Sequence, residues 1–413
     1  MPIAHVLRPS PVAPDLHDGR SIPRGRAAPN PATLATVERM ITKHDLERLI
    51  QREETGRPVV SLFLDMSVNS NNKRTHQVFL NQKREQFEEL QAEWMAANEE
   101  GVETLWERVQ RFLAEDYDES CAGVVIYAEV GGDGFEALHT RTPLQNRLIV
   151  APRPVVAPLA QVLEGYRHYG VVLIDREHVR LLSVYQGAVL DEIERRGDPL
   201  PPPHDVQAGG YAQSRYQRRK LEETKHFFRD FAGEVQEFVK RYAPDDLVLL
   251  GTEENLSAFA EHLPDSVLQR VVHTGPMWVD ENAAEIIRQL QPLLADELAR
   301  AQHEVVVQVR DRVVHDYMAT AGFQGTLSAL QEGRVDTLVL ARDQRREGVR
   351  CAQCGFVFAR EMDACPYDGS TALKDVDVVE EMVRMAEGQG ITVAFADPVE
   401  VADMKGAGAL LRY

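Results

Sequence analysis

Three strand-like segments follow one another closely in residues 171–193, which read VVLIDREHVRLLSVYQGAVLDEI. Apolar and β-branched residues fill three short runs, and the stretches between them, Asp175-Arg176-Glu177 and Gln186-Gly187, are typical of tight turns. The spacing leaves no room for a helix between the runs. We therefore predict an antiparallel meander with strands at 171–174, 179–185 and 188–193.

A stretch rich in proline and glycine, residues 199–210, leads from the meander into a long predicted helix. The apolar residues of this helix recur at intervals of three and four, which gives it one face to bury. They are Phe227, Phe228, Phe231, Val235, Phe238, Val239 and Tyr242. A strand at 247–251, a helix at 253–262 and a strand at 271–273 follow, and this alternation indicates a βαβ unit.

The segments on either side predict two further α/β domains. Before the meander we expect a helix at 42–52, a long helix at 75–98, and strands at 59–64, 123–128, 135–139 and 144–150. After it we expect helices at 281–294, 296–319, 325–331 and 376–387, and strands at 337–341 and 392–396. The predicted division is a disordered arm at 1–35, an N-terminal domain at 36–151, a middle domain at 152–276 and a C-terminal domain at 277–413.

Composition limits the possible functions. Of the 413 residues 44% are hydrophobic, but no run of 18 apolar residues occurs, so we expect a protein that does not cross a membrane. The net charge of -19 disfavours indiscriminate binding to DNA or RNA, so any RNA contact must be local. Four cysteines in so long a chain do not form a disulfide framework, which favours a reducing, cytoplasmic location.

The most informative stretch for function is Gly209-Gly210 and the ten residues after it, which carry four cations. Arg215, Arg218 and Arg219 are spaced to share one face at the start of a helix, where the helix dipole is positive and favours anions. Paired glycines allow close backbone approach to a ligand. The stretch is therefore a candidate for contact with RNA phosphates; the alternative is a solvated basic turn. The candidate RNA-binding residues are Gly209, Gly210, Tyr211, Gln213, Arg215, Arg218, Arg219 and Lys220.

This order of features resembles the archaeo-eukaryotic peptide chain release factor and Pelota superfamily, including bacterial-type members such as Balon-like hibernation factors and bacterial release factor homologues. In that superfamily the meander is followed by a loop, which carries Gly-Gly-Gln in the releasing members, and by an arginine-bearing helix. The resemblance implies a ribonuclease H-like middle domain whose loop enters the peptidyl-transferase centre of the ribosome. The catalytic glutamine of the family corresponds here to Tyr211.

The resemblance also implies partners. It implies binding to ribosomal RNA in the A site and delivery by a translational GTPase such as elongation factor Tu. Because the decoding motif Asn-Ile-Lys-Ser is missing near Ser70–Thr75, we expect hibernation or rescue without stop-codon reading. One alternative is a codon-independent peptidyl-tRNA hydrolase in which Gln213 is catalytic. Another is an RNA-binding module that does not act on ribosomes.

The C-terminal part extends the resemblance. Residues 325–340, GTLSALQEGRVDTLVL, and the closing stretch 404–413 resemble the family's C-terminal domain, which implies a kink-turn-protein-like α/β fold. Between them lies a cysteine-rich hairpin at 350–370. Its spacing of Cys351, Cys354, Cys365 and Asp368 is typical of a zinc ribbon with one carboxylate ligand, and some family members carry a zinc ribbon here. A structural zinc and a metal-free hairpin both fit this pattern.

Overall fold

The computed structural model describes residues 40–68, 74–90, 92–197 and 211–413. For residues 85–90, 92–99 and 211–221 only the backbone is described. The contacts divide these residues into two compact units. One unit comprises Tyr166–Glu297, and the other comprises Glu38–Gly165 together with Leu298–Tyr413. The arm predicted at 1–35 lies outside the described residues.

The 166–297 unit is built on a five-stranded sheet with the order β7-β6-β5-β8-β9. Its strands are β5 (Tyr169–Ile174), β6 (His178–Tyr185), β7 (Ala188–Arg196), β8 (Asp246–Leu250) and β9 (Val271–Gly275). The first three pair antiparallel, whereas β5, β8 and β9 run parallel. Gln186 and Gly187 both have positive φ, as a tight hairpin turn requires. The predicted meander and the ribonuclease H-like order are confirmed.

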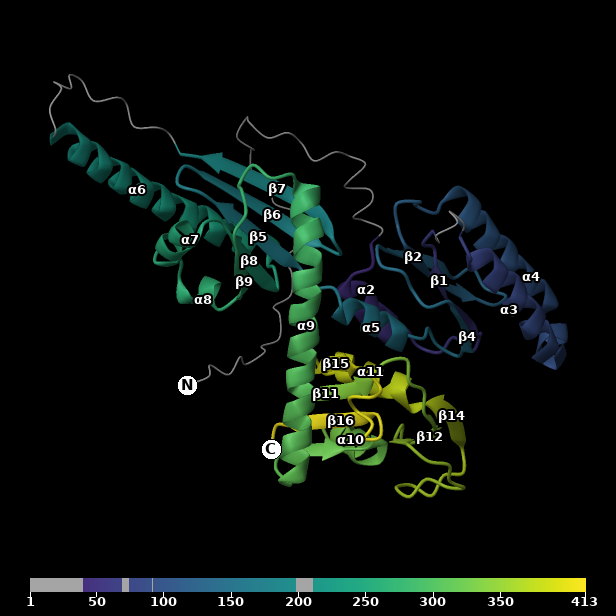
Figure 1. The fold of residues 1–413 in the computed structure, drawn as a ribbon. Coiled ribbons are helices and arrows are strands. Elements are labelled where there is room, and N and C mark those ends of the chain that lie inside the picture. The colour runs from purple at the N-terminus through teal and green to yellow at the C-terminus, as the bar shows by residue number, and fades with distance from the viewer. Residues whose placement is uncertain (1–39, 69–73, 91, 198–210) are drawn as a thin grey trace, which may run out of the picture. The chain divides into compact units, whose positions relative to one another are not determined.

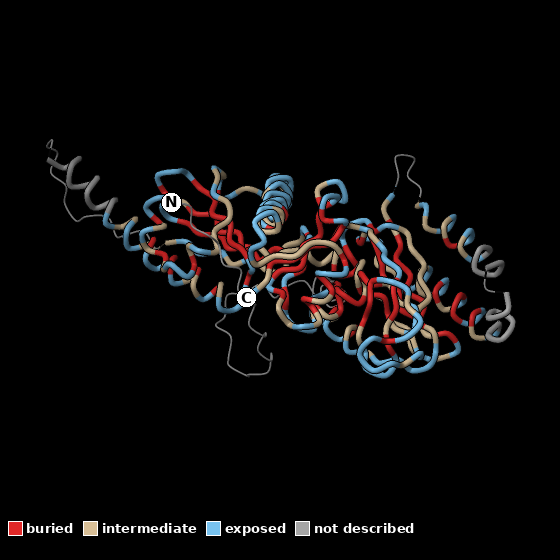
Figure 2. Tube along the Cα trace, turned by 90° about the horizontal axis from the view of Figure 1, so that it is seen from below, coloured by how far each residue is buried: buried red, intermediate tan, exposed pale blue. Residues whose placement is uncertain are grey.

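Apolar side chains cover both faces of this sheet. Val172 and Ile174 of β5 share a core with helices α6 (Tyr211–Tyr242), α7 (Glu253–Ala260) and α8 (Asp265–Leu268). Their neighbours Val171 and Leu173 share a second core with the start of α9 (Ala283–Val314). Alternate residues of one strand therefore serve opposite faces, as the pleat requires. Figure 1 shows α6 and α9 against this sheet, and Figure 2 colours the buried residues red.

The second unit contains a four-stranded antiparallel sheet in the order β3-β2-β1-β4. The strands are β1 (Val59–Asp65), β2 (Gly123–Glu129), β3 (Phe135–Thr140) and β4 (Arg147–Ala151). Helices α3 (His76–Leu90) and α4 (Ala92–Glu115) cover one face, whose core includes Leu62, Leu80 and Trp106. The prediction that helical structure ends near residue 98 was wrong, because α4 continues to Glu115.

The other face of that sheet belongs to a core shared with the C-terminal part of the chain. Phe63 and Tyr127 belong to the same cluster as Leu330, Met382 and Phe395. The cluster also includes residues of α2 (Lys43–Ile50), α5 (Ala157–Glu164), α10 (Phe323–Gln331) and α11 (Val378–Gly388). The C-terminal sheet has the order β10-β16-β11-β15, with β10 (Ala319–Ala321), β11 (Val335–Ala341), β15 (Thr392–Ala396) and β16 (Ala407–Leu411). The two segments of this unit, 38–165 and 298–413, thus share one of its apolar cores.

Helix α9 differs from its prediction. The two helices expected at 281–294 and 296–319 are one helix that continues through Pro292. Val279, Ile286 and Leu290 belong to the core of the 166–297 unit, whereas Val306 and Val309 belong to the core of the other unit. The multidomain α/β class is confirmed, and the division at residue 276 stays a prediction.

Candidate functional site

The amino-terminal turns of α6 carry the residues predicted to contact RNA. Gly209 and Gly210 lie outside the described residues. Tyr211 is the first helical residue, so the predicted helical placement of Arg215, Arg218 and Arg219 is correct. The first turn of α6 contains no acidic residue. Since free N–H groups and the dipole make a helix start positive, this end of α6 is suited to an anion.

The helical register divides these residues between two sides. Seven residues make almost two full turns, so positions seven apart lie on the same side. Arg215, Arg218 and Arg219 precede by seven the exposed residues Glu222, Lys225 and His226. The positions of the three arginines therefore continue the exposed side of α6. Tyr211, seven residues before Arg218, belongs to the same side.

Gln213 belongs to the opposite side. It precedes Phe227 by fourteen residues and Phe231 by eighteen, and both phenylalanines pack on the sheet. Lys220, seven residues before Phe227, follows the same side. In the helical register the position of Gln213 is therefore opposite to the positions of the three arginines.

The cysteine-rich hairpin brings its four predicted ligands together. It is a three-stranded sheet of β12 (Glu347–Cys351), β13 (Val357–Phe358) and β14 (Leu373–Asp377). Two similar turns follow Cys351 and Cys365, and each ends in a glycine with positive φ whose N–H donates to the carbonyl of the first cysteine. Those glycines are Gly355 and Gly369. They allow Cys354 and Asp368 to face the same point as the two cysteines.

The distances within this group fit a tetrahedral metal ion. One ligand atom from each of Cys351, Cys354, Cys365 and Asp368 lies within 4.8 Å of the others. The sulfurs of Cys354 and Cys365 are 3.5 Å apart, and Cys351 Sγ lies 3.4 Å from Asp368 Oδ2. Zinc–sulfur bonds of about 2.3 Å at tetrahedral angles place ligands roughly 3.7 Å apart. Three cysteines and an aspartate can therefore bind a metal here.

Backbone N–H groups favour the charged forms of two of these ligands. The N–H of Cys354 donates to Cys351 Sγ and lowers the pKa of that thiol, and the N–H of Gln353 adds to the effect. The N–H of Ser370 lowers the pKa of Asp368 in the same way. Anionic sulfur and oxygen are the forms that bind zinc.

Residues far away in the sequence hold the hairpin, and sequence reasoning did not find them. The side-chain amide of Gln331 in α10 donates to the carbonyl of Val357, and its oxygen accepts from the N–H of the same residue. Glu54 accepts from Lys374 at 2.9 Å and from Arg350. No sequence signal near residues 54 or 331 points to these contacts, because only the fold brings them to the hairpin.

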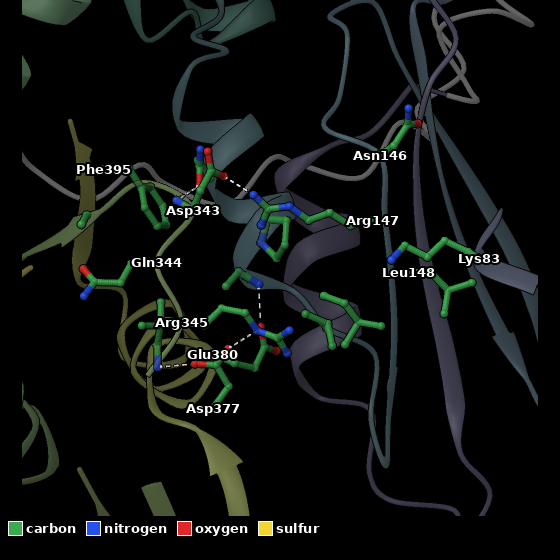
Figure 3. Close-up of a pocket in the computed structure, with 17 residues that line it drawn as sticks. Lys83, Asn146, Arg147, Leu148, Asp343, Gln344, Arg345, Asp377, Glu380 and Phe395 are labelled. Carbon is green, nitrogen blue, oxygen red and sulfur yellow. Dashed lines mark hydrogen bonds and ion pairs between the residues drawn. The ribbon is translucent and has the colours of Figure 1, made fainter. Parts of the chain in front are cut away.

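A pocket of about 270 Å³ in the same unit is a weaker candidate (Figure 3). Its charged residues largely neutralise one another: Arg147 binds Asp343, and Arg345 binds Asp377 at 3.1 Å. The carboxylate of Glu380 accepts from the N–H groups of Val156 and Ala157 at the start of α5. These contacts already serve the structure, so the pocket offers little for a ligand.

Within the described part of the chain, no helix is long and apolar enough to span a membrane.

Comparison with known proteins agrees with these features. Residues 154–295 match the model of bacterial archaeo-eukaryotic release factor family 10. Peptide chain release factor subunit 1 of Pyrococcus abyssi is 24% identical over 305 residues, which cover 66% of this chain and 72% of the relative. The factor of the same name from Methanocaldococcus jannaschii is 22% identical over 422 residues, covering 90% and 96%. Among solved structures, Dom34 of S. cerevisiae covers 72% of this chain and 81% of its own at 9% identity, with a TM-score of 0.39.

The middle-domain match and the release-factor relatives define the class of the chain, a multidomain α/β protein similar to translation factors. The same matches indicate its relatives. The chain is similar to archaeo-eukaryotic peptide chain release factors, and the match to their bacterial family 10 lies in residues 154–295.

Proposed function

We propose that this protein binds the ribosomal A site and directs the start of α6 towards the peptidyl-transferase centre, acting in hibernation or rescue without reading a stop codon. The observation that carries the proposal is the side of α6 defined by Tyr211, Arg215, Arg218 and Arg219. It follows directly on Gly209-Gly210 and continues the exposed side of the helix. Guanidinium groups bind phosphates through paired hydrogen bonds, and an aromatic ring stacks on bases.

The cations at the start of α6 form a small basic surface on a chain that is acidic overall. With a net charge of -19, the chain as a whole is repelled by RNA. Cations concentrated at a helix start, with no acidic residue in the first turn, give one attractive point. A folded RNA that surrounds this point, such as the large ribosomal subunit, offers many phosphates to a small surface.

The rival proposal is catalysis of peptide release. It is favoured by the name of the relatives, peptide chain release factor subunit 1. Against it stand Tyr211 directly after the two glycines and the register that puts Gln213 on the side opposite to the arginines. Catalysis depends on placement of the reacting groups to within about 1 Å, and a glutamine on the other side of a helix does not meet that need without rearrangement.

The two proposals are separated by incubating the full chain with ribosomes that carry labelled peptidyl-tRNA. We expect binding in the ribosome pellet without release of labelled peptide. Changing Arg215 and Arg219 together to alanine should weaken pelleting at least tenfold and reduce its salt dependence. The matched control is Arg229→Ala, an exposed arginine further along α6.

Three outcomes contradict the A-site proposal. Stoichiometric peptide release that Gln213→Ala abolishes would establish the hydrolase. Binding to free RNA but not to ribosomes would indicate an unrelated RNA-binding module. Equal loss of pelleting in the Arg229→Ala control would show that general charge, rather than this end of α6, determines binding.

We further propose two partners. A translational GTPase such as elongation factor Tu would deliver the protein, which pull-down of the full chain with the GTP-bound factor tests. Zinc bound by Cys351, Cys354, Cys365 and Asp368 would hold the hairpin, because its apolar core contains only a few residues. Elemental analysis of purified protein should find one zinc per chain, and an absence of zinc after reconstitution contradicts this assignment.

A further inference from the structure

The three cysteines of the hairpin differ in ways that matter for redox chemistry. Cys354 is exposed, whereas Cys351 and Cys365 are buried. The sulfur of Cys354 lies 3.5 Å from that of Cys365, so one exposed and one buried thiol are in contact. Cys351 is held on its other side by Asp368 and by two backbone N–H groups. An oxidant in solution would therefore meet Cys354 first, and the sulfur of Cys365 is in contact with it.

The fourth ligand sets the ease of metal loss. Asp368 supplies oxygen where a zinc ribbon usually has a fourth thiolate. A disulfide between Cys354 and Cys365 would remove two of the four ligands and leave one thiolate and one carboxylate, which is too few for a structural zinc. Closing the 3.5 Å gap to a disulfide length of about 2.05 Å requires a movement of only about 1.5 Å.

We propose that this hairpin is a redox switch in which a hydroperoxide oxidises Cys354 and Cys365 to a disulfide and expels the bound zinc. The Cys354 thiolate attacks the peroxide, the O–O bond breaks, and a sulfenic acid and hydroxide form. The Cys365 thiolate then attacks the Cys354 sulfur, an S–S bond forms, and a second hydroxide leaves. The two sulfurs lose two electrons, the peroxide gains them, and Zn²⁺ departs without changing its charge. A dithiol reductant reverses the step.

Loss of the metal should change the contacts that join the hairpin to the rest of its unit. Strand β13 is fixed to α10 through Gln331, and strands β12 and β14 are fixed to Glu54 through Arg350 and Lys374. The hairpin core is too small to keep these strands in place alone. Loss of the metal should therefore loosen the contacts at residues 54 and 331, and hydrogen exchange should rise there.

The test uses the zinc-loaded full chain and one equivalent of hydrogen peroxide. We expect release of one zinc per chain, measured with a chromogenic chelator, and a loss of about 2 Da in a cross-linked peptide pair containing Cys354 and Cys365. Asp368→Cys should bind zinc more tightly and release it more slowly, since a fourth thiolate replaces the carboxylate ligand. Cys121→Ser is the control, because Cys121 is a buried cysteine outside the hairpin.

Several results would overturn the switch. Zinc retained after complete oxidation of Cys354, or a disulfide joining Cys351 to Cys354 instead, contradicts the proposed pairing. A release rate unchanged by Asp368→Cys contradicts the role of the carboxylate, and failure of the reconstituted chain to bind zinc removes the basis of the switch. The switch rests on the zinc binding proposed above, but none of these results depends on ribosome binding, so the switch and the ribosomal role fail independently.

Discussion

The five-stranded sheet of the 166–297 unit and the junction of α5 with α11 in the other unit are held together by different forces. The sheet buries apolar side chains on both faces, including Phe228, Phe238 and Ile286. The α5–α11 junction, formed by Pro154, Val156, Ala157, Glu380 and Arg384, buries charges that satisfy one another and the ends of the backbone. A substitution in the sheet should lower the free energy of unfolding in proportion to the side-chain volume removed. At the junction, the decrease should depend on which buried charge the substitution leaves without its partner.

The largest effect is expected from Phe238→Ala. Phe238 is fully buried and lies so close to β5 that a side chain at Gly170 would clash with its ring. Removing the ring leaves a cavity and should lower the free energy of unfolding by about 4 kcal/mol, measured by urea denaturation. Phe238→Leu, which keeps most of the volume, should cost less than half as much. Equal losses for both variants would show that volume does not govern this sheet.

The second largest effect is expected from Arg384→Met, which should lower the free energy of unfolding by about 3 kcal/mol. The guanidinium donates to Glu380 at 2.8 Å and to the carbonyls of Ile50 and Pro154, and methionine fills the space but leaves a buried carboxylate unpaired. The exposed Arg288, which pairs with Glu285, provides the control as Arg288→Met, which should lower the free energy of unfolding far less because solvent screens this pair. A double variant that also changes Glu380 to Gln should recover part of the stability, and no recovery would contradict pairing as the cause.

A pH-dependent effect is expected at Glu164, which burial gives a pKa of about 7. The group is neutral in the folded protein at pH values where the unfolded chain has already ionised. Its contribution is therefore complete below pH 4.5 and is lost as pH rises from 4.5 to about 7. Glu164→Gln should abolish this decline, which amounts to roughly 3 kcal/mol in the free energy of unfolding. Thermal denaturation across that range measures it, with exposed Glu254→Gln as control; parallel curves for Glu164→Gln and the unmodified chain would refute the assignment.

The smallest effect is expected from Trp278→Ala. This side chain is 81% exposed, although it is as large as those that hold the sheet. Its removal should change the free energy of unfolding by less than about 0.5 kcal/mol. A loss comparable to that of Phe238→Ala would mean that exposed area contributes to stability here, and the contrast between core and surface would not hold.

The sequence predicted the regular parts well because their signals are local. Alternation and turn residues located the meander, and spacings of three and four located the packed half of α6. It failed at helix ends, because helical structure was expected to stop near residue 98 and to break between 294 and 296, whereas α4 continues to Glu115 and α9 is one helix to Val314. At Gly101 an added Cβ would lie 2.8 Å from the backbone nitrogen of Gly131, so this glycine serves close packing rather than helix termination.

The candidate sites were predictable to a similar extent. The cysteine spacing gave the four ligands, because two turns of the same form are local features. The contacts of Glu54 and Gln331 with the hairpin, and those of Glu164 with Gln302 and Phe395, join segments distant in the chain. No periodicity encodes such pairs. The opposite sides of Gln213 and the arginines follow from the helical register once the start of α6 is known.

The 32 residues of α6 have one more consequence, because they span about 48 Å. Residues 211–227 precede Phe228, the first fully buried side chain among those described in this helix, and they measure about 25 Å. Deletions in this stretch can change the length of the helix and the direction in which its arginine positions face, and the two effects can be separated. Deleting seven residues from it withdraws the tip by about 10 Å with its arginines still facing the same way, whereas deleting five turns them by roughly 140°. If binding depends on how far the helix reaches, the seven-residue deletion should weaken it. If binding depends on the side that the arginines face, the five-residue deletion should weaken it.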